Sequence, residues 1–163
     1  CSVAVHNLIA TDAALNEFDT NYKVLPPLRT QNDCDALIEG LKDGTIDMVT
    51  TDHNPIDIEH KKIEFDFAKN GTIGLESAFG ALQTLFTTKK AIGILTQGKS
   101  RFGIMSHPIN EGELANLSLF NPEGVFTFES GDILSKSKNS AYLGHKLKGK
   151  SYGVIANSKI VLK

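Results

Sequence analysis

Apolar and polar positions alternate over residues 46–52 and predict a buried strand there. The segment runs from Ile46 to Asp52 and is broken by Pro55. Successive side chains of a strand point to opposite faces, so Met48, Thr50 and Asp52 share one face. We therefore expect Asp52 to end the strand and to point inward. A carboxylate at the carboxyl end of a strand is where a β/α barrel carries its chemistry, although an aspartate before a turn also commonly caps a loop.

A helical period precedes this strand. Apolar residues recur at i, i+3, i+4 and i+7 between Cys34 and Leu41, a capping box begins at Thr30, and Gly44 stops the helix. Residues 1–6 are typical of a short buried strand, so the order is strand, helix, strand, which implies parallel pairing. His6 lies at the end of the first strand. A histidine there can be a ligand or line an active site, but a lone histidine more commonly has a structural role.

The middle of the chain predicts two further helices. A glycine-rich segment from Asn70 to Gly74 leads into a strongly periodic helix over residues 75–86, and a second helical stretch covers residues 89–96. Glycines before a helix let backbone N–H groups approach a ligand, although they also serve simple turns. The charged loop over residues 54–72 is interpreted mainly as a solvated face.

From Gly112 the period changes from helical to alternating. Short strands are predicted over residues 115–120, 125–128, 151–156 and 159–162, with Asn157 and Ser158 as a hairpin turn. The predicted organisation is therefore a β/α part over residues 1–111 and a small β subdomain over residues 112–163.

Composition narrows the classes of function. The chain has 163 residues, a net charge of -2 and a pI near 6.2, so it lacks the basic surface of a protein that binds nucleic acid or an anionic membrane. Cys1 and Cys34 form no disulfide framework, which favours a reducing, cytoplasmic setting. The first residue is not methionine, and the sequence begins as if already inside a strand, so we expect a piece of a longer polypeptide.

Several segments together resemble one family, the type I dihydroorotases of the cyclic amidohydrolase superfamily. The resemblance runs nearly end to end and in the same order. The segments that carry it are Cys1-Ser2-Val3-Ala4-Val5-His6-Asn7-Leu8, Lys23-Val24-Leu25-Pro26-Pro27-Leu28-Arg29-Thr30, Asp43-Gly44-Thr45-Ile46-Asp47, Thr51-Asp52-His53-Asn54-Pro55, Gly74-Leu75-Glu76-Ser77-Ala78, Leu134-Ser135-Lys136-Ser137-Lys138-Asn139 and Gly144-His145-Lys146-Leu147-Lys148-Gly149.

The resemblance implies an α/β fold that is the C-terminal portion of a (β/α)8 barrel, with strands seven and eight and their helices, followed by part of a β-sandwich. It also implies two zinc ions in the complete protein, and Asp52 is the metal ligand and catalytic residue that this sequence retains. In such an enzyme a zinc-activated water attacks the ring amide, and Asp52 takes its proton and returns it to the leaving nitrogen.

The substrate pocket implied by the resemblance is altered. Leu25 stands where the family has an asparagine that contacts substrate, and Ile56 stands where it has a histidine that binds the substrate carboxylate. Asn70 and Gly71 keep their place and are expected to offer backbone contacts to the ring. Loss of a partner for a buried charge costs roughly 3–5 kcal/mol, or about 10²–10⁴ in rate or affinity.

Three functions remain open for the complete protein. The first is a zinc-dependent dihydroorotase that opens dihydroorotate to N-carbamoyl-aspartate in pyrimidine biosynthesis, and the second is an inactive homologue that supports assembly of aspartate carbamoyltransferase. The third is a hydantoinase or allantoinase, because the apolar Ile56 suits a ring without a carboxylate. The chain alone is expected to be inactive, since it lacks most of the implied metal ligands. Its open sheet edge predicts a homo-oligomer or strand exchange.

Overall fold

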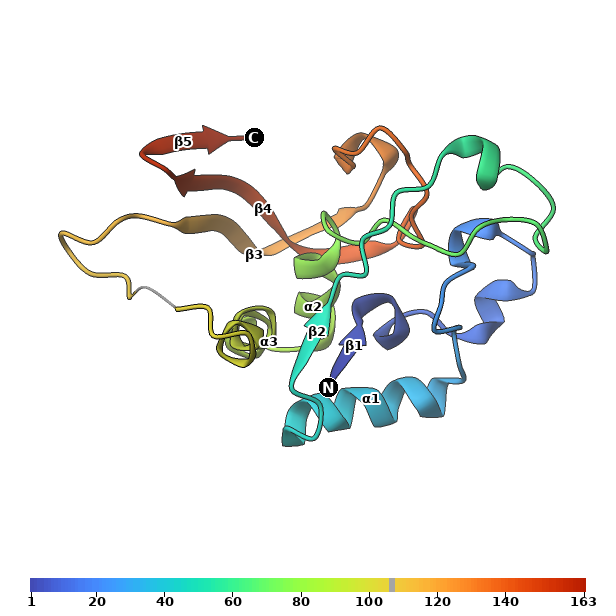
Figure 1. Ribbon diagram of the computed structural model, residues 1–163, viewed down its shortest axis with the longest axis horizontal. Coiled ribbons are helices and arrows are strands. Elements are labelled where there is room, and N and C mark those ends of the chain that lie inside the picture. The colour runs from blue at the N-terminus through green and yellow to red at the C-terminus, as the bar shows by residue number, and fades with distance from the viewer. Residues whose placement is uncertain (106–107) are drawn as a thin grey trace.

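A two-stranded parallel sheet lies at the centre of the chain, as Figure 1 shows. The computed structural model describes residues 1–105 and 108–163. Strand β1 (Ser2–Ala4) pairs with β2 (Met48–Thr50), and Ser2 lies opposite Met48. The predicted parallel pairing is confirmed, but both strands are shorter than the sequence pattern indicated.

The prediction that the second strand continues to Asp52 is wrong. The backbone of Asp52 has a φ of 44°, which is the left-handed region, and its N–H donates to the Thr50 hydroxyl at 2.9 Å. When a threonine hydroxyl accepts a hydrogen bond from the backbone N–H two residues later, the chain turns away from the hydrogen-bonded strand pair. The alternation of faces therefore stops at Thr50 and does not determine where Asp52 points.

Helix α1 (Gln31–Asp43) follows the prediction closely. The Thr30 hydroxyl accepts from the Asp33 N–H and the Asp33 carboxylate accepts from the Thr30 N–H, so the capping box is present. Gly44 ends the helix with a φ of 89°. Cys34 and Leu41 are buried, which places the predicted apolar stripe against the rest of the fold.

Two helices follow the long loop. Helix α2 (Ala78–Leu85) begins three residues later than predicted, because residues 74–77 form a turn, and α3 (Thr88–Arg101) is one continuous helix. Helix α2 packs against β4 and α3 packs against β2. No helix among residues 1–105 and 108–163 has both the length and the apolar character needed to cross a membrane.

The end of the chain forms an antiparallel sheet in the order β3 (Leu117–Thr127), β4 (Lys146–Ala156), β5 (Lys159–Leu162). The two strands predicted over 115–128 are one strand, with a register shift between Asn121 and Val125 where Pro122 has no N–H to give to the ladder. Asn157 and Ser158 both have positive φ, which confirms the hairpin turn.

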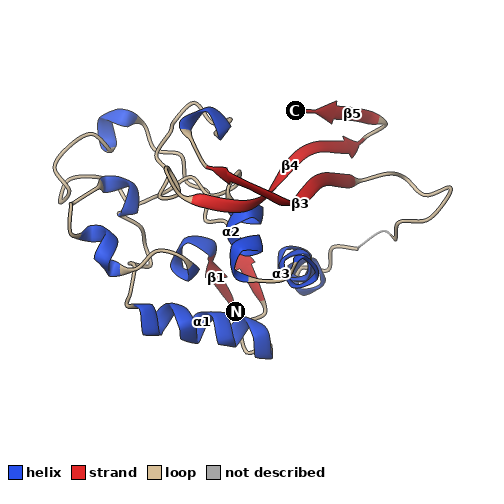
Figure 2. Ribbon diagram, turned by 180° about the vertical axis from the view of Figure 1, so that it is seen from behind, coloured by secondary structure: helices blue, strands red, loops and turns tan. Residues whose placement is uncertain are grey.

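One hydrophobic core joins the two sheets. Val5 after β1, Leu41 of α1 and Leu82 of α2 belong to the same buried cluster as Phe128 and Tyr142, which flank the antiparallel sheet. Figure 2 shows α2 between the parallel pair and the antiparallel sheet. The boundary near residue 112 marks the change from helices to strands and stays a prediction as a domain division. Short 3₁₀ turns lie at Val5–Leu8, Asp12–Leu15, Thr20–Tyr22, Ile58–His60 and Ser130–Asp132.

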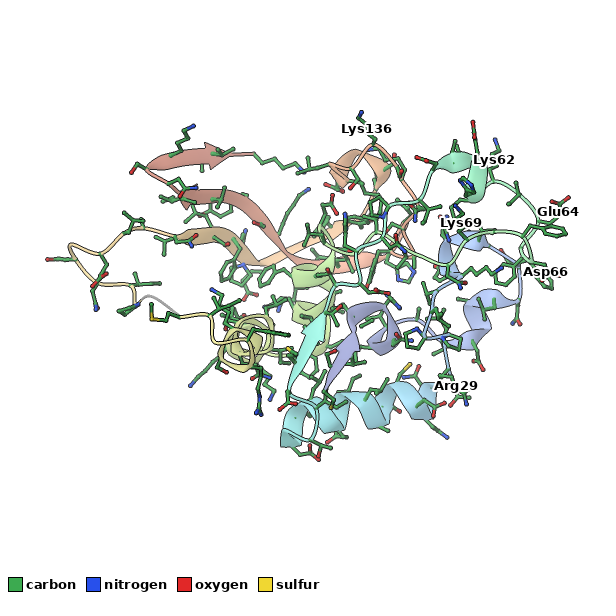
Figure 3. All side chains as sticks on the ribbon, viewed as in Figure 1. Arg29, Lys62, Glu64, Asp66, Lys69 and Lys136 are labelled. Atoms are coloured by element: carbon green, nitrogen blue, oxygen red, sulfur yellow. The ribbon has the colours of Figure 1, made fainter. Side chains whose placement is uncertain are left out.

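The charged loop over residues 54–72 is only partly a solvated face. Glu64 and Asp66 are exposed and point away from the body of the protein in Figure 3. Lys61, in contrast, is 6% exposed, and its ammonium donates to the carbonyls of Thr20 at 2.6 Å and Lys69 at 2.9 Å. A buried lysine that bonds backbone carbonyls ties this loop to the segment before the double proline.

Burial lowers the pKa of Lys61 to about 8 from 10.5. Between these two pH values the unfolded chain binds more protons than the folded chain, so the free energy of unfolding is expected to rise with pH. The rise attributable to Lys61 is roughly 2–3 kcal/mol. Urea unfolding of Lys61→Met from pH 8 to pH 10.5 should lack this rise, whereas Lys62→Met, at an exposed neighbour, should keep it. Equal slopes in all three proteins would contradict the burial of a charged Lys61.

Candidate active site

Asp52 and His6 meet at the carboxyl ends of the two parallel strands. His6 lies in the 3₁₀ turn that follows β1, and Asp52 lies two residues after β2. Because β1 and β2 are parallel neighbours, their carboxyl ends share one edge of the sheet. The Nε2 atom of His6 is 4.0 Å from Oδ2 of Asp52. The fold therefore brings an imidazole to the carboxylate that the sequence singled out.

The His6 ring is buried without a hydrogen-bond partner. The residue is 0% exposed, and neither ring nitrogen bonds any group in the described part of the chain. Burial lowers the pKa of His6, and the nearby Asp52 carboxylate opposes this shift only in part. The imidazole is therefore neutral near pH 7, and one nitrogen carries a free lone pair. Buried polar atoms are normally satisfied, so these two indicate a missing partner.

A neutral imidazole beside a carboxylate suits zinc, which binds histidine nitrogen and aspartate oxygen. Asp52 can reach such an ion because its side chain is 43% exposed. Within residues 1–105 and 108–163, however, no three His, Cys, Asp or Glu side chains gather as a metal site would require. A zinc site needs at least three protein ligands, so this chain offers part of a donor set.

Of the four predicted substrate contacts, the structure brings Ile56 and Gly71 together. A Cβ added to Gly71 would lie 3.1 Å from Cγ1 of Ile56. The Gly71 N–H donates to the Lys23 carbonyl at 2.9 Å, so it is already bonded and is not free for a ring. Asn70 is exposed, and Leu25 is 66% exposed beside the double proline. The substrate roles of all four residues stay predictions.

The side chain of Asn139 links the backbone at Asn54 and Ile56 to the backbone at Gly71. The sequence analysis assigns Asn139 no role. Its amide nitrogen donates to the Asn54 and Gly71 carbonyls at 3.1 and 3.2 Å, while its carbonyl accepts from the Ile56 N–H at 2.9 Å. It is 5% exposed, so all of these bonds are shielded from water. The only signal in the sequence was its place at the end of the resembling segment 134–139.

A cavity of about 690 Å³ opens beside Ile56 and Asn139. Its other walls come from the 3₁₀ turns near Thr20 and Ile58 and from residues 136–138, and Asp52 and His6 are not among its lining residues. In Figure 3 Lys136 lies at the outer rim of this region, with its side chain pointing outward. The predicted catalytic carboxylate therefore does not line this cavity, although Ile56 does.

Two solved structures share the fold of this chain. The structure of L-hydantoinase from Arthrobacter aurescens matches all of this chain with a TM-score of 0.87, at 22% identity, and the match covers 39% of that chain. The inactive dihydroorotase-like domain of a Chaetomium thermophilum multifunctional protein also matches all of it, with a TM-score of 0.66 at 18% identity, over 45% of that chain. At these identities the likeness establishes the fold alone.

Comparison of sequences finds dihydroorotases as relatives of this chain. The dihydroorotase of Caldanaerobacter subterraneus is 42% identical over 153 residues, which covers 90% of this chain and 36% of that protein. No family model matches the chain. The resemblance read from the motifs is confirmed: the chain is a relative of the dihydroorotases and spans about two fifths of the length of the curated relatives it matches.

Proposed function

We propose that this chain carries the proton-transfer group of a cyclic amidohydrolase, and that the complete protein is a dihydroorotase like its relatives. The single observation that carries the proposal is the approach of Asp52 to the His6 ring, which has no hydrogen-bond partner among residues 1–105 and 108–163, at one edge of a parallel sheet. That edge is where a (β/α)8 barrel holds its chemistry. The chain would form the last part of such a barrel and the adjoining part of a β-sandwich.

The proposal assigns His6 and Asp52 to one zinc site that the rest of the longer protein completes. Zinc bound there would supply Lewis-acid activation of water at neutral pH. Asp52, with its half-exposed carboxylate, would take the proton of the attacking water and give it to the ring nitrogen that leaves. His6, held neutral by burial, would serve only as a ligand.

The proposed substrate is a cyclic amide such as dihydroorotate. Ile56 stands at the position that would contact the substrate carboxylate. An isoleucine offers no donor to an anion, so the Ile56→His variant of the complete protein should raise kcat/KM for dihydroorotate. A charge-assisted hydrogen bond contributes about 1.5–3 kcal/mol, which corresponds to a gain of roughly 10–100-fold. Hydantoin, which lacks the carboxylate, is the control substrate and should gain nothing. An equal change for both rings would contradict this role of Ile56.

A second candidate is an inactive homologue that supports a partner such as aspartate carbamoyltransferase. The observation that favours it is the apolar character of both Leu25 and Ile56. The test is to supply dihydroorotate to the complete polypeptide at its natural zinc content and to follow ring opening. Turnover well above that of Asp52→Ala supports the enzyme. Turnover equal to that of Asp52→Ala leaves the scaffold role, which co-purification with the transcarbamoylase then tests.

A further inference from the structure

We propose, in an inference that rests on the proposed function, that His53 is a positioning residue for Asp52. Hydrogen bonds at both ring nitrogens of His53 hold this part of the chain in place. His53 follows Asp52 directly in the chain. Its Nδ1 accepts from the Leu75 N–H at 3.1 Å, and its Nε2 lies 3.3 Å from the Ser135 hydroxyl. The ring thereby bridges the turn before α2 and the segment that follows the last 3₁₀ turn.

The hydrogen bonds define the state of the ring. A backbone N–H can only donate, so Nδ1 of His53 presents its lone pair to the Leu75 N–H, and the ring proton lies on Nε2. Nε2–H therefore donates to the Ser135 hydroxyl. Oε2 of Glu76 lies 3.7 Å from the same Nδ1, which is longer than a hydrogen bond. Ser135, His53 and Glu76 have the residue types of a nucleophilic triad, but Nε2 cannot accept the serine proton while it carries the ring proton. The contact is a structural anchor rather than a nucleophile and its base.

The same short segment also holds the residue before Asp52. A Cβ added to Gly74 would lie 2.5 Å from the Thr51 carbonyl oxygen, so these two backbones are in close contact. His53 in turn bridges to the backbone of Thr72 in a parallel arrangement. Asp52 thus sits between two residues that are both fixed by residues 72–75.

The conformation of Asp52 makes such anchoring necessary. A non-glycine residue with positive φ is of higher energy than an extended or helical one and persists where its surroundings determine it. The Asp52 backbone has a φ of 44°, and its own N–H donates to the hydroxyl of Thr50, two residues earlier. Loss of the His53 ring would let the turn relax and move the carboxylate relative to His6.

Three substitutions at His53 in the complete protein test this role by steady-state kinetics. His53→Ala should lower kcat for dihydroorotate about 10–100-fold with KM within about threefold, because misplacement of a catalytic group by 1 Å costs about 10² in rate. His53→Asn should recover most of kcat, since its amide oxygen can accept from the Leu75 N–H. His53→Gln, which reaches toward Ser135 instead, should recover less. His60→Ala is the control, because no hydrogen bond of the His60 ring occurs in the described part of the chain.

A spectroscopic measurement tests the same inference without turnover. In protein with ¹⁵N-labelled histidine, long-range proton–nitrogen correlations should place the ring proton of His53 on Nε2 and none on Nδ1. A proton on Nδ1, as in an imidazolium paired with Glu76, would overturn the inference, and so would an Asn variant no better than the Ala variant. If the wild-type protein does not turn over at all, the proposed function fails, and the tautomer measurement still decides whether His53 anchors the turn.

Discussion

Replacing Asp52 by asparagine in the complete protein is expected to lower kcat for ring opening by about 10³-fold. Asparagine keeps the shape of the side chain but cannot take a proton, and loss of a general acid–base group costs typically 10²–10⁴ in rate. The fold should survive, because the Asp52 carboxylate is 43% exposed and accepts no hydrogen bond from the described residues. Steady-state assays alongside thermal unfolding separate the two effects.

Asp66→Asn is the matched control for this prediction. Asp66 lies on the long loop over residues 54–72, is exposed and points away from the body of the protein in Figure 3, so its substitution should change kcat by less than about twofold. An Asp52→Asn variant that retains more than a tenth of wild-type kcat would show that the proton passes through another group.

Replacing Gly74 by alanine is expected to have the largest effect on stability. The added Cβ would meet the Thr51 carbonyl oxygen at 2.5 Å, and this neighbour is backbone, which cannot turn aside as a side chain would. Forcing an atom into a packed interior costs typically 1–3 kcal/mol, so we expect the free energy of unfolding to fall by about 3 kcal/mol. Urea unfolding of the chain measures the change.

Gly93→Ala is expected to change the free energy of unfolding in the opposite direction and to stabilise the same chain. Gly93 lies inside α3 with no atom within 4 Å of an added Cβ, and alanine in a helix interior is favoured over glycine by about 0.5–1 kcal/mol. The two glycine substitutions should therefore differ by roughly 4 kcal/mol. A Gly74→Ala protein as stable as the wild type would mean that the turn before α2 does not press on the Thr51 carbonyl.

Local sequence signals predicted the helical parts of the fold well. The Thr30 capping box and Gly44 bracket α1 in the sequence and in the structure, because capping depends on residues within one turn of each other. The hairpin at Asn157 and Ser158 is equally local. The parallel pairing of β1 with β2 followed from the strand, helix, strand order alone.

Features that depend on distant neighbours could not be predicted. The residue after Asp52, His53, accepts from the Leu75 N–H, 22 residues away, and this contact leaves no mark on the alternation of apolar residues. The pattern of charges places Lys61 on the surface, because the sequence does not show that its ammonium bonds the Thr20 carbonyl, 41 residues away. The sequence leaves the role of His6 open, because it is the pairing of β1 with β2 that brings His6 to Asp52.

The measurement that tests the account most directly is the position of zinc in crystals of the complete, metal-loaded protein, located by anomalous scattering at the zinc edge. The account predicts a zinc ion bound by both His6 and Asp52, with the Zn–N and Zn–O distances near 2.0–2.2 Å that such ligands give. A zinc ion held elsewhere, with the His6 ring nitrogens still unbonded to metal, would contradict it.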